Sequence, residues 1–266
     1  MSTVDLQVAS ATQLQQQHHH HLFPSLLEAA RSLASVLVIS LFALTFLVQP
    51  FRIPSESMER TLLVGDFLLV NKSVYGPAGH WGWLLPYGRV KRGDVVVFHF
   101  PLDPPEHVVK RVIGVPGDRI HLRNGEVFVN GRPISEPYAV YEQSYRDSFR
   151  DQFPLTPYSD PGVDSHWWLE MRRDVQEGDL IVPANNYFVL GDNRNHSRDS
   201  RYWGFVPKGA IVGRPLVVYF SLRQQPADEL PGLPQTPSND RLGHDNDPMN
   251  GIVDFARWDR MFHIVR

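Results

Sequence analysis

The chain has 266 residues, of which 42% are hydrophobic and 21% charged, with a formal net charge of −3 and no cysteine. This size and composition suit one large domain, or two small ones, with a substantial core. The balanced charge excludes the basic face expected of a nucleic-acid partner, and the missing cysteines exclude disulfides, thiol catalysis and cysteine-ligated zinc. We therefore expect no cofactor and no metal, and any catalysis must use other side chains.

The N-terminal region combines a biased tail with an uncharged segment. Residues 1–31 include a run from Gln13 to His21 that ends in four histidines; it predicts a disordered, cytoplasmic tail, with metal binding as the alternative. Residues 32–51 are twenty residues without a charge, which is the length of helix that crosses a membrane. A buried core helix and a cleaved signal peptide compete with this interpretation. We predict a transmembrane helix over 32–51.

Residues 52–266 show the pattern of a β-rich catalytic domain. Short stretches rich in Val, Ile and Phe alternate with turn residues, which is typical of strands. Asn124-Gly125 and Asn130-Gly131 predict tight turns between antiparallel strands, because these residue types accept positive φ. The predicted strands are residues 66–71, 94–100, 107–115, 119–122, 126–129, 186–190 and 210–221.

Three further segments lack this strand pattern. Residues 137–173 are aromatic and charged with little periodicity, and residues 224–250 are rich in Pro, Asp and Asn, so both are predicted to be loops or insertions. The chain ends in FARWDRMFHIVR, a basic amphipathic sequence. A packed terminal element is the favoured interpretation for this end, and contact with a membrane surface is the alternative.

Ser57 is the candidate nucleophile because of its position. It follows Phe51 by six residues, so an extended chain at ~3.3 Å per residue keeps it within roughly 20 Å of the predicted membrane face. Serine needs a base that removes its proton. The histidines His99, His107 and His121 leave a Ser-His-Asp arrangement open, although none lies in a recognisable catalytic sequence.

Lys110 is the stronger candidate for the base. In a strand through HVVKRVIG, alternation places Lys110 on one face with Val108 and Val112, and Arg111 on the other. Burial among apolar side chains lowers a lysine pKa, and a neutral amine can accept a proton. Periodicity alone leaves open a surface lysine that pairs with a carboxylate.

Four segments together resemble the sequence boxes of the bacterial type I signal peptidase family. They are IPSESMERTL (53–62), GDFLLVNK (65–72), VVKRVIGVPGD (108–118) and GDNRNHSRDSRYWGFVP (191–207). The likeness extends from the predicted transmembrane helix to about Phe220. The first box of that family usually reads S-x-S-M-x-P-T-L, whereas this chain has Arg60 at the proline position. The resemblance implies a mainly β fold of coiled antiparallel sheets, preceded by one transmembrane helix.

The resemblance also implies roles for individual residues. Ser57 would be the acylated nucleophile and Lys110 its general base; the Ser55 hydroxyl and the Ser57 backbone N–H would form an oxyanion hole, and Ser197 would orient the lysine amine. The remaining matched residues are expected to line the substrate cleft or support the site: Met58, Asp192, Asn193, Asp199 and Arg201. Gly191, with Asp192 to Arg194, is expected to shape the turn that presents Ser197.

The expected activity is cleavage of signal peptides from exported preproteins, through an acyl-enzyme and after small residues of the A-x-A type. The expected partners are these preproteins and the lipid bilayer, with the chain acting as a monomer in the bacterial cytoplasmic membrane. It would cross that membrane once, with its catalytic domain on the periplasmic side. The alternatives are a self-cleaving Ser/Lys regulator of the repressor type, for which no helix-turn-helix is apparent, and a membrane-anchored β domain that binds proteins without catalysis.

Overall fold

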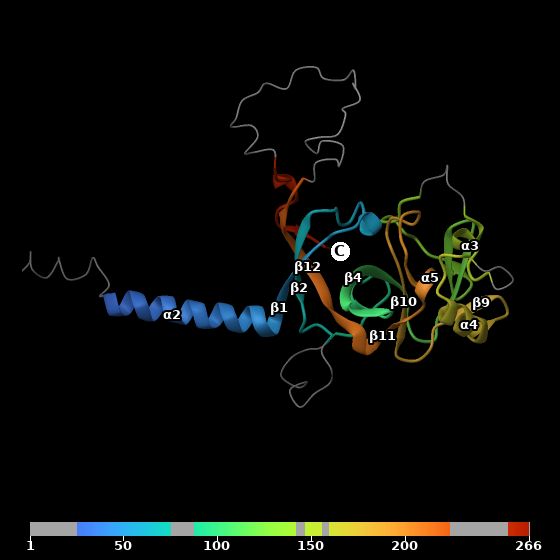
Figure 1. Ribbon diagram of the computed structural model, residues 1–266, viewed down its shortest axis with the longest axis horizontal. Helices are drawn as coiled ribbons and strands as arrows, with labels where there is room; N and C mark the ends of the chain where they lie inside the picture. Colours follow the sequence, from blue (N-terminus) through green and yellow to red (C-terminus); the bar gives the residue numbers. More distant parts are fainter. Residues whose placement is uncertain (1–25, 76–87, 142–146, 156–159, 224–254, 266) are drawn as a thin grey trace, which may run out of the picture. The chain divides into compact units, whose positions relative to one another are not determined.

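The computed structural model describes residues 26–75, 88–141, 147–155, 160–223 and 255–265 (Figure 1). The described chain forms two compact units, one ending at Leu47 and the other beginning at Val48. The glutamine- and histidine-rich tail and the predicted 224–250 loop lie outside the described residues.

The N-terminal unit is one long apolar helix. It runs as α2 from Leu26 to Phe42 and continues as the π-helical segment η1 from Ala43 to Leu47. Within residues 27–47 an 18-residue window has a mean hydropathy of 2.0, and the helix is long and apolar enough to cross a membrane. The helix therefore begins six residues before the predicted 32–51 segment and ends four residues before the end of that segment. The helix starts earlier because Glu28 and Arg31, which lie before the uncharged segment, are part of the helix. Their charges bound the uncharged segment but do not interrupt helical backbone.

The helix ends before the predicted residue 51 because of Pro50. Val48–Arg52 forms strand β1, which pairs antiparallel with Phe67–Asn71 of the next strand. Proline lacks the N–H that a helix interior needs and biases the preceding residue toward extended backbone. It is tolerated in β1 because that strand lies at a sheet edge. Ser57 consequently follows the end of the helix by ten residues.

The larger unit contains two antiparallel sheets (Figure 1). The first has the order β1-β2-β12-β3-β4-β10-β11, with β13 also paired to β12, and the second has the order β7-β6-β5-β9-β8. In the first sheet the strands after β1 are β2 (Asp66–Asn71), β3 (Val95–Phe100), β4 (Asp103–Gly114), β10 (Asn186–Leu190), β11 (Val206–Pro207), β12 (Ile211–Ser221) and β13 (His263–Ile264). The second sheet comprises β5 (Arg119–Arg123), β6 (Glu126–Val129), β7 (Arg132–Pro133), β8 (Val175–Gln176) and β9 (Asp179–Ile181).

The mainly β, antiparallel class is confirmed, and every predicted strand is present. Strands β2, β6 and β10 keep their predicted bounds. Strand β4 begins at Asp103, four residues before the predicted start at residue 107. The Asn124-Gly125 turn has φ values of 51° and 86°, as the β5–β6 hairpin requires. The strands that prediction missed are mostly two or three residues long, too short for alternation to show.

The 137–173 segment is not simply a loop. It contains helix α3 (Ser148–Asp151) and most of α4 (Ser165–Asp174). The Asp164 carboxylate caps α4 by accepting from the backbone N–H groups of His166 and Trp167. Trp167 and Met171 lie one helical turn apart and are buried in the core beneath the second sheet. That short apolar repeat was the signal for α4.

The C-terminal sequence is a packed element, as predicted. Trp258–Arg260 forms the 3-10 helix η5, and β13 then pairs with Val217 and Val218 of β12. Ala256 and Val265 are buried. This segment, drawn red beside β12 in Figure 1, packs against the sheet whose strands β1 and β2 flank the loop of the candidate nucleophile.

Strand β3 separates two apolar cores. Val95 and Val97 belong to a core with Met58 and Leu62, which follow Ser57 in sequence. Val96 and Phe98, on the opposite face, belong to a core with Val112 of β4. Because strand side chains alternate between faces, one continuous apolar strand supports both the nucleophile loop and the strand of the candidate base.

Candidate active site

Ser57 lies in a loop anchored at both ends. After β1, residues Glu56–Met58 form the 3-10 helix η2. The Met58 carbonyl accepts hydrogen bonds from the N–H groups of Thr61 (3.1 Å) and Leu62 (2.8 Å). The Met58 and Leu62 side chains are buried in the core beside β2, so packing fixes the chain on the C-terminal side of the serine.

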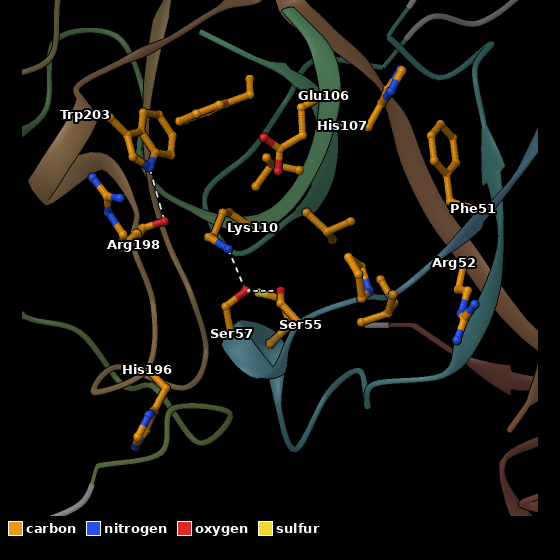
Figure 2. Close-up of a pocket in the computed structure, with 16 residues that line it drawn as sticks. Phe51, Arg52, Ser55, Ser57, Glu106, His107, Lys110, His196, Arg198 and Trp203 are labelled. Atoms are coloured by element: carbon orange, nitrogen blue, oxygen red, sulfur yellow. Dashed lines mark hydrogen bonds between the residues drawn. The ribbon is translucent and has the colours of Figure 1, made fainter. Parts of the chain in front are cut away.

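Lys110 is buried and in contact with Ser57. Its Nζ lies 2.6 Å from Ser57 Oγ (Figure 2), and the two residues are only 3% and 7% exposed. Lys110 pairs across the sheet with Val96, and Val96, Val108 and Val112 pack in one core. The predicted alternation of this strand is confirmed.

Burial of the Lys110 amine disfavours its charged form. It lowers the pKa of Lys110 from 10.5 to about 8, while the carboxylates of Asp199 and Asp192 act in the opposite direction. An amine with this pKa is substantially neutral at mildly alkaline pH. When charged it donates a hydrogen bond to Ser57 Oγ, and when neutral it offers a lone pair to the serine proton.

A cleft of about 360 Å³ opens over this pair. Phe51 and Arg52 lie on one side of Ser57 in Figure 2, and Arg198 and Trp203 lie on the other. Ser55 lines the cleft with its Oγ 3.3 Å from Ser57 Oγ. Met58 also lines the cleft, as predicted. Sequence reasoning missed the other lining residues, because they come from separate strands and turns.

The 191–194 turn does more than present Ser197. The Asn193 N–H donates to the Ser57 carbonyl at 3.1 Å. Asp192 is fully buried and accepts two hydrogen bonds from Arg111, of 2.8 and 2.7 Å, together with one of 2.5 Å from Thr61 Oγ1. Thus Arg111, which follows the candidate base, ties β4 to both the turn and the nucleophile loop.

The predicted Asp199–Arg201 ion pair is present and buried. Arg201 donates to both carboxylate oxygens at 2.8 and 2.7 Å. Burial alone would raise the pKa of Asp199, but the charge and hydrogen bonds of Arg201 hold it below its ordinary value of 3.8. The pair therefore stays charged and fixes the turn, in keeping with a supporting role.

Ser197 is placed beside the site without a hydrogen bond to the lysine. Its hydroxyl is buried and makes no hydrogen bond of ordinary geometry to any described residue, although it lies close enough to Asp199 to help lower that pKa. Gly191 explains the tight approach: a Cβ there would lie 2.3 Å from Ser197 Oγ and 2.5 Å from the Ser57 carbonyl oxygen.

The histidines are occupied elsewhere. His99 Nδ1 contacts the Pro104 carbonyl at 2.8 Å, and His121 Nδ1 contacts the Gly178 carbonyl at 3.0 Å. His107 lines the cleft, but its ring packs against that of His99, tilted by 46° at a centroid distance of 4.4 Å. Within the described chain, Ser57 Oγ accepts a side-chain hydrogen bond from Lys110 and shares one with Ser55 Oγ.

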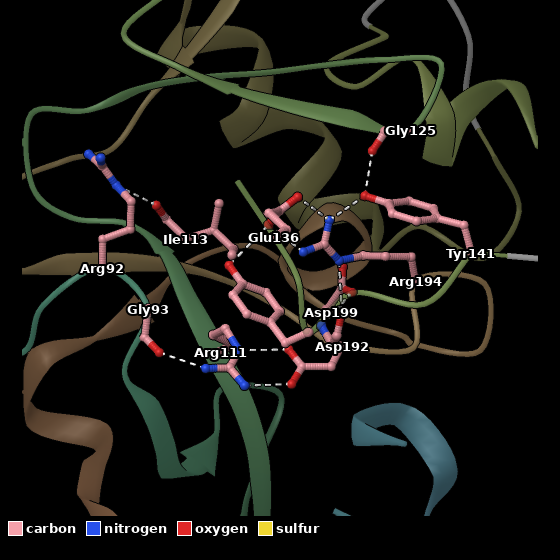
Figure 3. A network of polar contacts seen from close by, with 12 residues as sticks. Arg92, Gly93, Arg111, Ile113, Gly125, Glu136, Tyr141, Asp192, Arg194 and Asp199 are labelled. Carbon is pink, nitrogen blue, oxygen red and sulfur yellow. Dashed lines mark hydrogen bonds and ion pairs between the residues drawn. The ribbon is translucent and has the colours of Figure 1, made fainter. Parts of the chain in front are cut away.

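A second polar network, drawn in Figure 3, supports the same turn. Arg194 is buried and donates to both oxygens of Glu136, at 2.8 and 2.5 Å, and to Tyr141 Oη at 2.7 Å. The Val140 N–H donates to the Asp192 carbonyl. Residues 136–141 therefore hold the 191–194 turn in place through these hydrogen bonds. No local sequence pattern indicated this role.

Arg60, at the position where the resembled box has proline, adopts φ = 80°. Proline is confined to φ near −65°, so this backbone conformation is closed to it. The Arg60 side chain is exposed. The departure from the usual box is thus accompanied by a left-handed turn just after η2.

Several known proteins are similar to this chain. The sequence pattern of the family described as "Signal peptidase, peptidase S26" matches residues 26–220. "Signal peptidase I" of Pseudomonas fluorescens is 38% identical over 226 residues, covering 79% of this chain and 78% of that protein. "Signal peptidase I" of Aquifex aeolicus is 33% identical, covering 70% and 81%. A crystal structure of a signal peptidase I from Enterococcus faecalis V583 is 28% identical, with a TM-score of 0.32, and covers 47% of this chain and 96% of that chain.

Proposed function

Because this chain belongs to the signal peptidase family, peptidase S26, and is a signal peptidase I serine protease anchored by an apolar helix, we propose that Ser57 and Lys110 are its catalytic dyad. The supporting observation is the buried contact of 2.6 Å between Lys110 Nζ and Ser57 Oγ. The substrates are signal-peptide-bearing preproteins.

The first half of the proposed reaction forms an acyl-enzyme. Ser57 Oγ attacks the scissile carbonyl carbon while its proton passes to the neutral amine of Lys110. The resulting oxyanion accepts hydrogen bonds from the Ser55 hydroxyl and the Ser57 N–H. When the C–N bond breaks, the Lys110 ammonium returns its proton to the departing amine of the mature protein, which leaves the signal peptide as an ester on Ser57.

The second half reverses these roles. Lys110, again neutral, takes a proton from a water that attacks the ester carbonyl, and the Ser57 oxygen recovers that proton as it leaves. Ser197 Oγ and the Ser57 carbonyl both approach Gly191 closely, which supports assigning to Ser197 the orientation of the amine during these transfers. Asp199 and Arg201 keep the turn that carries Ser197 in place.

Substrate choice rests on the cleft and on the membrane together. A cleft with apolar lining such as Ile53, Met58 and Val108 suits small side chains before the cut, of the A-x-A kind. Each methylene that must be rejected supplies only about 1–3 kcal/mol of discrimination. Anchoring enzyme and preprotein in one bilayer raises their effective concentration. We place the enzyme, with a single span, in the bacterial cytoplasmic membrane, its catalytic domain on the periplasmic side.

The test is cleavage of one signal-bearing preprotein by the purified full chain in detergent, with the new N-terminus sequenced. We expect Ser57→Ala and Lys110→Met each to abolish cleavage, while the controls Ser73→Ala and Lys91→Met keep it. Substantial cleavage by either dyad variant would refute the assignment. Binding of the preprotein without any new N-terminus would instead favour a non-catalytic β domain.

A further inference from the structure

The loop that carries Ser57 closes on itself at a narrow neck. The Ile53 N–H donates to the Asp66 carbonyl at 2.8 Å, and the Gly65 N–H donates to the Ile53 carbonyl at 3.0 Å. Everything between these pairs, including η2, is therefore one closed loop. Its conformation depends on what holds the neck and the residues that follow Ser57.

Arg260, from the C-terminal segment of residues 255–265, holds both. Its Nε and Nη2 donate to the two carboxylate oxygens of Asp66, at 3.2 and 2.6 Å, and Nη2 also donates to the Thr61 carbonyl at 3.1 Å. The Asp66 carboxylate further accepts from the Leu63 N–H at 2.9 Å and from Ser221 Oγ at 2.6 Å. One guanidinium thus fastens a backbone carbonyl of the loop to a buried carboxylate at its neck.

Arg257 makes a second attachment from the same segment. It donates to the Val64 carbonyl, to the Leu222 carbonyl at 2.7 Å and to Ser221 Oγ at 2.9 Å. A β-bridge between Leu222 and Ala256 fixes the segment itself. Two arginines of this segment therefore bind backbone carbonyls of the nucleophile loop, Arg260 that of Thr61 and Arg257 that of Val64.

Thr61 connects this attachment to the catalytic turn. While its carbonyl accepts from Arg260, its N–H donates to the Met58 carbonyl and its Oγ1 donates to Asp192. Thr61 is four residues from Ser57, with the buried Met58 between them. A shift of Thr61 would therefore be transmitted both to η2 and to the turn whose Asn193 N–H binds the Ser57 carbonyl.

From these contacts we propose that Arg260 is a positioning residue for Ser57, and that residues 255–265 form a brace without which the serine loses its alignment with Lys110. The brace follows the end of the family match at residue 220, so it is an element that this match does not include. The inference rests on the proposed role of Ser57 as the nucleophile. Its effect on catalysis is indirect, because Arg260 acts through Thr61 and Asp66.

The decisive variant is Arg260→Lys in the full chain. Lysine keeps a positive charge beside Asp66, but one ammonium cannot reproduce the forked contacts to the carboxylate and to Thr61 together. Arg92→Lys is the matched control, because Arg92 makes the same kind of contacts with Asp118 (2.9 and 2.8 Å) and a backbone carbonyl (3.1 Å) without touching the nucleophile loop.

We expect kcat of Arg260→Lys to fall roughly tenfold or more at unchanged KM, because small misalignments of reacting groups are costly. The midpoint of the kcat–pH profile should also move to higher pH as water reaches Lys110. The rate is divided by the folded fraction measured at each pH, so that loss of folded protein cannot move the midpoint. An unmoved midpoint would then overturn the proposal, as would a kcat equal to that of Arg92→Lys. Ser57→Ala, assayed in parallel, separates the two hypotheses: if it still cleaves, the proposed dyad fails rather than the brace.

Discussion

Replacing Lys110 by methionine should abolish activity and yet stabilise the protein at neutral pH. Lys110 lies among apolar side chains, and its charged form is disfavoured there. The fall of its pKa from 10.5 to about 8 corresponds to about 3 kcal/mol opposing the folded state while the amine is charged. Methionine fills a similar volume without a charge. It gives up the contact with Ser57 Oγ, which costs about 1 kcal/mol, so the net gain at pH 7 is about 2 kcal/mol.

The sign of the pH dependence distinguishes this explanation from better packing. Between pH 8 and 10.5 the unfolded chain keeps the Lys110 proton and the folded chain has lost it, so the wild-type free energy of unfolding rises with pH. Below pH 8 both states hold the proton and the full penalty applies. The advantage of Lys110→Met should therefore be constant below about pH 8, fall to zero near about pH 9.5, and become a disadvantage of about 1 kcal/mol at about pH 10.5.

The measurement is denaturant unfolding of the full chain in detergent, followed by tryptophan fluorescence from pH 6.5 upward. Other groups titrate alike in both proteins, so the difference between variant and wild type isolates Lys110. Lys91→Met, at an exposed position, controls for removing a surface charge. A variant less stable than wild type at pH 7, or a difference independent of pH, would refute the argument that burial of this amine carries the penalty.

Three further outcomes can be measured with the same protein. The rate of preprotein cleavage should rise through a midpoint near pH 8, the pKa that burial gives Lys110, because only the neutral amine accepts the serine proton; a midpoint near 6.5 would indicate a histidine. Ser197→Ala should lower the rate strongly at nearly unchanged unfolding temperature, since its hydroxyl makes no ordinary hydrogen bond that folding would lose; unchanged turnover would remove its orienting role. Gly191→Ala should lose turnover and about 1–3 kcal/mol of stability through overpacking, because its Cβ would meet Ser197 Oγ and the Ser57 carbonyl; wild-type kinetics would contradict the tight approach.

The parts of this molecule that sequence could predict are those with local repeats. Alternation of apolar residues located the strands and put Lys110 and Arg111 on opposite faces of β4. The end of the N-terminal helix was also within reach, because Pro50 signals extended backbone, but the uncharged run outweighed it. Hydropathy alone does not separate a helix from the edge strand that continues it.

The supporting contacts could not be predicted in this way. Arg194 and Glu136 are 58 positions apart, and Arg260 and Asp66 are 194 apart. Such pairs are brought together by the topology of the sheets and by the segments after β6 and β12, and they leave no periodicity. Their partners are buried carboxylates, which only the folded chain reveals.

The left-handed turn at Arg60 bears on exchange of segments between relatives. A box ending in M-x-P-T-L cannot be transplanted here with the surrounding backbone unchanged, since φ = 80° lies outside the range of the proline ring. A chimera of that kind would swap two loop geometries rather than two side chains. Differences in turnover between such chimeras would therefore report how each backbone delivers its serine, even where every catalytic group is identical.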